Sequence, residues 1–169
     1  MERAMKQQPV PNAPARASES VPCLVRPGES FGYRLWTVTH AWQRRVEAVL
    51  TPLGLTHMQY VLLAKTAWLL HQGEAPSQTR IACAAQIDRM MASKVLRTLE
   101  EKGFVARSEH PDDPRANSVA LTPAGRAALN EAIPIVRATQ DAFFGRLGPE
   151  GQAALAEHLD RLIALEGRG

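Results

Sequence analysis

The chain has 169 residues, of which 45% are hydrophobic and 22% are charged, and its formal net charge is +3. This size and composition fit one globular domain with a core of its own, or one domain with an appendage. No run of 18 apolar residues occurs and the first 30 residues lack a signal-peptide pattern, so we expect a cytoplasmic protein without a membrane-spanning helix.

The charge is unevenly distributed along the chain. Residues 80–126 hold eight Lys or Arg and six Asp or Glu residues, whereas residues 127–169 hold four and six. The middle of the chain is therefore its most densely basic part, and the C-terminal part is acidic. This asymmetry permits a polyanionic partner without proving one.

The chain is expected to begin with a tail that leads into a helix. Residues 1–29 contain five prolines and few large apolar residues, which disfavours regular structure. From residue 30 to about residue 50, apolar residues recur at spacings of three and four, which is typical of one stripe on a helix. The stripe consists of Leu35, Val38, Trp42, Val46 and Val49.

Three shorter helices follow, and each begins after a residue that can cap it. Thr56 and Gln59 match a capping box, and Ser77 and Asp88 can cap the next two helices. The helices are expected over about residues 57–71, 78–85 and 89–102. The tight turn between the last two is typical of a helix-turn-helix unit.

Two strands and two long helices complete the predicted pattern. Residues 104–107 and 118–121 are predicted to be strands, and the polar residues 109–117 between them to be a long loop. Thr122 and Pro123 are typical of a helix start, which predicts a helix to about residue 144. A last helix is expected from residue 148.

This order of elements predicts a mainly α fold with a small two-stranded β wing. In such a winged helix-turn-helix, the second helix of the pair lies in the major groove of DNA. The outer face of the helix at 89–102 offers donors and cations that suit base edges and phosphates. These residues are Arg89, Met90, Ser93, Lys94 and Arg97. The residues expected to pack inward are Met91, Val95, Leu96 and Leu99.

Four segments of the chain resemble the MarR family of bacterial transcriptional regulators. They are LGLTHMQY at 53–60, MMASKVLRTLEEKGFV at 90–105, PDDPR at 111–115 and LTPAGR at 121–126. The order and spacing of the segments together are specific, and the resemblance spans about residues 31–165.

The resemblance implies a homodimer with a helical dimerisation region beside each winged helix. Residues 30–55 would form a dimerisation helix, 56–121 the DNA-binding region and 122–169 the C-terminal dimerisation helices, with 1–29 as a flexible tail. It also implies a repressor that binds a pseudo-palindromic operator in double-stranded DNA and is released by a small aromatic or phenolic effector.

The resemblance also implies DNA-binding roles for individual residues. Ser93 and Lys94 match the pair that contacts a base and a phosphate, and Arg97 lies on the next exposed turn. Asp113 and Arg115 match the Asp-x-Arg signature of the wing, with Arg115 suited to the narrow minor groove. A region that touches backbone phosphates is matched by Ser77, Gln78 and Thr79.

An effector would bind between the dimer-forming helices and the winged helix, as the resemblance implies. Side chains that could hold an aromatic anion there by stacking and by donating hydrogen bonds are Tyr33, Arg34, Trp36, His40, His57 and Tyr60. Trp36 and Tyr60 are equally well explained as core or dimer-interface residues, and both interpretations stay open.

The chain departs from the family pattern at Gln86, where glycine is common before the second helix of the pair. If this residue adopts a left-handed conformation, glutamine costs about 1 kcal/mol more than glycine.

Two alternatives to a ligand-responsive regulator stay open: a winged-helix protein-interaction module without DNA binding, and a thiol-based redox-sensing repressor. Cys23 falls in the tail, nine residues before the position of the family's sensing cysteine at Gly32, which argues against redox sensing. Cys83, in an alanine-rich helix, is expected to be a small buried residue.

No histidine pair has metal-ligand spacing within one helix, and no acidic pair is accompanied by a base or nucleophile. We therefore expect no metal, no other cofactor and no enzymatic activity.

Overall fold

The computed structural model describes residues 30–110 and 113–166, and only the backbone of residues 113–116. The expected tail at 1–29, including Cys23, lies outside the described residues. The elements are α1 (Phe31–Leu50), η1 (Thr51–Leu53), α2 (His57–His71), α3 (Gln78–Ala85), α4 (Arg89–Glu101), β1 (Val105–His110), β2 (Asp113–Leu121), α5 (Pro123–Phe144), η2 (Gly145–Leu147) and α6 (Gly148–Glu166). Within the described ranges, no helix is long and apolar enough to cross a bilayer.

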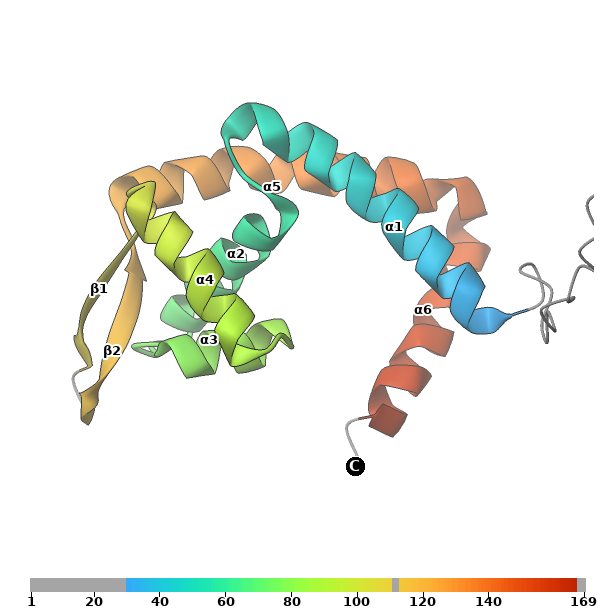
Figure 1. Cartoon of the computed structure of the whole chain (residues 1–169). Coiled ribbons are helices and arrows are strands. Elements are labelled where there is room, and N and C mark those ends of the chain that lie inside the picture. Colours follow the sequence, from blue (N-terminus) through green and yellow to red (C-terminus); the bar gives the residue numbers. More distant parts are fainter. Residues whose placement is uncertain (1–29, 111–112, 167–169) are drawn as a thin grey trace, which may run out of the picture.

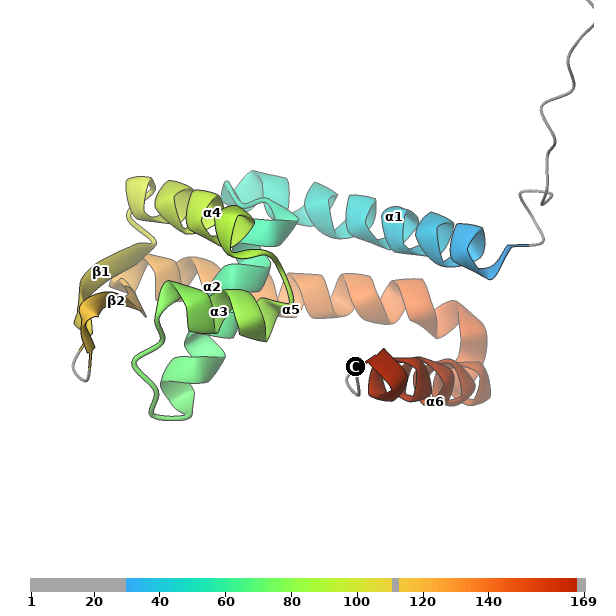
Figure 2. The same ribbon diagram turned by 60° about the horizontal axis from the view of Figure 1, so that its bottom comes forward.

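The described chain consists of a compact lobe and a long helical extension. The helices α2, α3 and α4 and the antiparallel pair β1–β2 form the lobe (Figure 1). The helices α1 and α5 leave it side by side, and α6 lies at their far end (Figure 2). This arrangement confirms a mainly helical fold with a two-stranded wing.

Local side-chain caps set the starts of the helices. The side chains of Thr56, Ser77, Asp88 and Thr122 each accept a hydrogen bond from the backbone three residues later, as expected from the sequence. The capping box is complete, because the Gln59 side chain also accepts from the backbone N–H of Thr56 at 3.1 Å. Each cap satisfies a backbone donor that the first helical turn leaves free.

One hydrophobic core joins the lobe to the inner halves of the extension. Its fully buried members include Leu62, Leu63 and Leu69 of α2 and Leu96 and Leu99 of α4. The long helices contribute Val46, Leu50, Leu129, Ala132 and Val136. The outer half of α1 and all of α6 lie beyond this core, and α6 has no buried residue. The lobe and the inner halves of α1 and α5 thus share one core, to which the far end of the extension contributes no buried residue.

The hairpin is longer than predicted. Residues 109–117 were expected to be a loop, but β1 and β2 pair from Val105↔Leu121 to His110↔Asp113, with a register shift after Glu109. The prediction was wrong because an antiparallel pair is held by backbone hydrogen bonds, which polar residues form as well as apolar ones. The wing therefore extends well beyond its apolar base.

Two expectations about burial were also wrong. Cys83 is exposed, because the buried face of α3 is formed by Ile81 and Ala82, and Cys83 lies about 200° around the helix from Ile81. Met91 is exposed, and the buried face of α4 instead includes Ala92 beside Leu96 and Leu99.

Candidate nucleic-acid interface

The outer face of α4 is open to solvent along its length. Arg89, Lys94 and Arg97 are exposed, Met90 is 83% exposed, and Ser93 is half-buried. The opposite face of the helix is anchored in the core, so the backbone that carries these side chains is firmly held. Helical spacing puts all five residues singled out from the sequence on one side of α4. This helix lies next to the wing (Figure 1).

The cations on this face are only weakly engaged within the protein. Arg97 Nε lies 3.1 Å from Glu101 Oε1, and both side chains are largely exposed, so this ion pair is weak. Among the residues that the structure describes, no carboxylate is within ion-pair distance of Arg89 or Lys94. The face is thus ready to bind an external anion.

The start of α3 lies in the same lobe. The Ser77 hydroxyl accepts from the backbone N–H of Arg80 at 3.3 Å, while Gln78 is half-buried and Thr79 is exposed. The residue before this cap pairs with the wing, because the N–H of Val119 donates to the carbonyl of Pro76 at 2.9 Å. This bond ties the start of α3 to the base of the hairpin.

Asp113 and Arg115, the two wing residues singled out from the sequence, both lie in β2. Their side chains lie outside the described ones. The backbone puts Arg115 on the outer part of the hairpin, beyond the pair Glu109↔Asn117.

A turn at one end of α4 and two hydrogen bonds at the other set its position relative to its neighbours. Gln86 has φ 54° and ψ 42°, the left-handed conformation considered for it, and so turns the chain sharply between α3 and α4. At the other end of α4, Lys102 Nζ donates to the carbonyl of Gly54 at 2.6 Å and to Gln59 Oε1 at 3.0 Å. Since Gln59 also completes the capping box, α4 is tied to the start of α2.

A hollow of about 380 Å³ lies beside that start, between α1 and α2. It brings together two of the predicted effector residues, His40 and His57. The other residues that line it are Gln43, Arg44, Glu47, Thr56 and Met58. Sequence reasoning missed Gln43, Arg44 and Glu47, although they follow His40 at spacings of three, four and seven, which share a helix face.

The other predicted effector residues do not line this hollow. Tyr33, Trp36 and His40 form a ladder of rings on exposed α1, with centroids 6.1 Å and 4.5 Å apart. Arg34 lies on the same exposed segment. Tyr60 instead packs against the core, and burial raises the pKa of its hydroxyl.

The surroundings of His57 disfavour the protonated form of its imidazole. Burial lowers the pKa of its imidazole, and Glu47 partly offsets this effect. The backbone N–H of His57 donates to Glu47 Oε2 at 2.6 Å, and the Trp42 ring meets the imidazole edge-on at 5.1 Å. Within the described residues, no group of three His, Cys, Asp or Glu side chains is arranged to hold a metal ion.

Comparison with known proteins gives close relatives. Residues 55–116 match a model described as the MarR family. The HTH-type transcriptional regulator YdcH of Bacillus subtilis is 42% identical over 118 residues, which cover 70% of this chain and 80% of YdcH. The HTH-type transcriptional repressor Rv2887 of Mycobacterium tuberculosis is 33% identical over 132 residues, covering 78% and 92% of the two chains.

Solved structures agree with this comparison. Rv2887 in complex with salicylic acid matches at 32% identity with a TM-score of 0.60, covering 79% of this chain and 96% of that one. Bordetella bronchiseptica BpsR, described as regulated in its DNA binding by 6-hydroxynicotinic acid, matches at 25% identity with a TM-score of 0.73, covering 82% and 96%. The predicted winged-helix fold is thereby confirmed.

Proposed function

Because this chain belongs to the MarR family of winged-helix transcriptional regulators, we propose that it is a homodimeric repressor that binds a DNA operator and releases it on binding a small aromatic acid. The proposal of DNA binding rests on the exposed basic face of α4 beside the wing. Its cations would contact phosphates, and Ser93 and Met90 would contact base edges in the major groove.

The helical extension supports the dimer. A 19-residue helix with no buried residue, as α6 is here, gains little stability from packing against its own chain. Large apolar side chains are exposed at the same end of the molecule: Phe31, Leu35, Trp36, Val38, Leu147, Leu159, Leu162, Ile163 and Leu165. A second copy that covers this surface would give each α6 a core and set the spacing between the two α4 helices.

The hollow at His40 and His57 supports an aromatic acid as effector. Arg44 offers a cation for a carboxylate, and the two imidazoles offer ring surface and ring nitrogens for hydrogen bonds. The ligands named for two relatives, salicylic acid and 6-hydroxynicotinic acid, are both small aromatic acids. An effector that lowers DNA affinity 100-fold must prefer the DNA-free form by about 2.7 kcal/mol.

The decisive experiment is fluorescence anisotropy with duplex DNA from upstream of the protein's own gene, measured across a salt series. We expect two chains per site and a steep fall of affinity with salt. Lys94→Gln should lower affinity and reduce the salt slope by about 1.8, because each of the two chains loses one phosphate contact worth about 0.9. The matched control is Lys65→Gln on α2, whose ammonium group lies over the Trp68 ring instead.

Binding to DNA without any dependence on salt, or no binding to operator and random duplexes alike, would exclude the proposed function. An unchanged salt slope for Lys94→Gln would exclude only the phosphate contact at that residue.

A further inference from the structure

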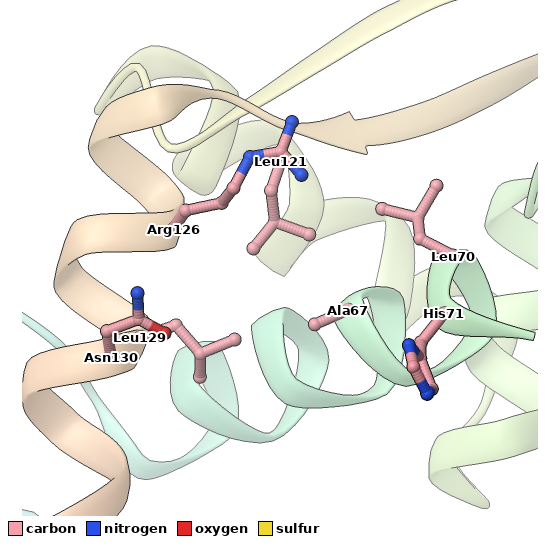
Figure 3. Close-up of a pocket in the computed structure, with 7 residues that line it drawn as sticks. All are labelled: Ala67, Leu70, His71, Leu121, Arg126, Leu129 and Asn130. Carbon is pink, nitrogen blue, oxygen red and sulfur yellow. The ribbon is translucent and has the colours of Figure 1, made fainter.

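We propose that a second hollow, between the end of α2 and the first turns of α5, binds a small carboxylate with a compact aliphatic body. This hollow has a volume of about 340 Å³. Its lining is Ala67, Leu70 and His71 of α2, Leu121 at the end of β2, and Arg126, Leu129 and Asn130 of α5 (Figure 3).

The walls of the hollow are aliphatic. Leu121 and Leu129 are 4% exposed and fix one side, while the half-buried Ala67 and Leu70 form the other. Among the residues that the structure describes, the imidazole of His71 is the only aromatic ring that lines this space. The walls therefore suit a branched or cyclic aliphatic group, which gains free energy by leaving water.

The rim of the hollow is polar and carries one strong cation. Arg126 and Asn130 are four residues apart on α5 and therefore share a face, and His71 stands on the opposite wall (Figure 3). Within the described part of the chain, the side chains of Arg126, Asn130 and His71 form no hydrogen bond or ion pair. A guanidinium free to form two parallel hydrogen bonds recognises a carboxylate, and a single cation favours a singly charged ligand.

This hollow is separate from the one at His40 and His57. His57 is the first residue of α2 and His71 the last, so the helix puts about 21 Å between them at 1.5 Å per residue. The two sites also differ in lining. Each has an arginine and histidine, but only this hollow has walls of Leu and Ala.

An occupant would act at the base of the DNA-binding elements, a consequence that rests on the proposed function. The Thr122 hydroxyl donates to the carbonyl of Gly103 at 2.6 Å, and the N–H of Thr122 donates to the carbonyl of Phe104 at 3.1 Å. The first turn of α5 is thus attached to the turn between α4 and the wing. A ligand that contacts both this turn of α5 and the end of α2 would make the attachment of α5 to the DNA-binding elements more rigid.

The test is a titration of the free full-length protein, with labelled Ala and Leu methyl groups, followed by NMR at pH 7. The probe is cyclohexanecarboxylate, and the neutral cyclohexanecarboxamide is its comparison. We expect saturable shifts of the methyl signals of Ala67, Leu70, Leu121 and Leu129 with the carboxylate, and binding at least about tenfold weaker with the amide. Arg126→Gln should also raise the Kd for the carboxylate about tenfold or more, as expected when a charge-assisted hydrogen bond is lost.

Two further variants make the result decisive. Arg137→Gln removes an exposed arginine farther along α5 and should leave the Kd unchanged. Ala67→Leu keeps Arg126 but fills the hollow, and it should abolish the shifts even if Arg126→Gln fails to fold. Equal affinity for the acid and the amide, or an Arg126→Gln Kd equal to that of the unmodified chain, would overturn the proposal. Because the titration contains no DNA, its result can be interpreted even if the operator experiment fails.

Discussion

Gly125, in the first turn of α5, has no space for a larger side chain. A Cβ atom at this position would overlap the carbonyl oxygen of Phe104, which belongs to the backbone and cannot move aside. We expect Gly125→Ala to lower the free energy of unfolding by about 1–3 kcal/mol, the usual cost of overpacking, as measured by urea denaturation.

Gly32→Ala is the matched control for this substitution. Its Cβ would come no closer than 3.6 Å to Ser30 Oγ, an ordinary contact. Alanine should therefore stabilise α1 slightly, by up to about 1 kcal/mol. Equal effects at the two glycines would contradict the close approach of α5 to Phe104.

The imidazole of His57 gives a prediction about pH. Because its pKa in the folded protein lies below the ordinary value of 6.5, the unfolded chain binds more protons between the two values. The contribution of His57 to stability is therefore complete above about pH 6.5 and decreases as the pH falls below it. Glu47→Gln removes the opposing charge and should lower the pKa of His57 further, as followed by NMR of the imidazole. Glu131→Gln on α5, with the same change in charge, should leave the His57 titration unchanged.

At the scale of the element, the turn between α3 and α4 holds Gln86 in a conformation that favours glycine. Gln86→Gly should raise the free energy of unfolding by about 1 kcal/mol, because the side chain no longer strains the left-handed backbone. Thermal and urea denaturation would measure the gain. Gln86→Ala is the control, since alanine retains the Cβ and should bring no such gain. A stabilisation of equal size by alanine would mean that the left-handed backbone is not the cause.

The helices could be predicted from the sequence more accurately than the wing. Helix starts depend on local bonds between a side chain and the backbone three residues away, so Thr56 and Asp88 identify them without tertiary information. The hairpin depends on bonds between distant backbone groups, which the sequence does not mark. Its polar outer residues therefore resembled a loop.

The two candidate sites also differ in how far the sequence predicts them, because one depends on local spacing and the other on contacts between distant segments. The exposed face of α4 follows from helical spacing alone, and so did the prediction of Arg89, Lys94 and Arg97. The hollow at His40 and His57 depends on how α2 crosses α1, which spacing along either helix does not give. Tyr60 was grouped with these residues because it is near His57 in sequence, but its ring packs against the core.

At the scale of the whole molecule, α6 is a long helix that has no buried residue within its own chain. Ile163 is 62% exposed, and the proposed dimer would bury it. Ile163→Glu introduces a charge into that contact, so we expect sedimentation velocity to detect a single chain, and operator binding to fall sharply because the two half-sites are no longer linked.

Arg161→Gln is the control for this experiment. It changes the net charge by the same amount, on a different face of α6, and should leave the dimer intact. A dimer that survives Ile163→Glu would mean that α6 is covered in another way.

The length of α5 turns small rotations into large displacements. Its 22 residues span about 33 Å at 1.5 Å per residue, from the base of the wing to the end that carries α6. Treated as a rigid lever pivoted at that far end, it would move the winged lobe by roughly 3 Å for each tilt of about 5°, a quarter of the ~12 Å width of the major groove. In the proposed dimer the two-fold axis would give the second lever the equivalent movement, so the change in the spacing of the half-sites would double. In the proposed mechanism a ligand would then need to supply only a slight angular change, because the length of the helical extension would amplify it.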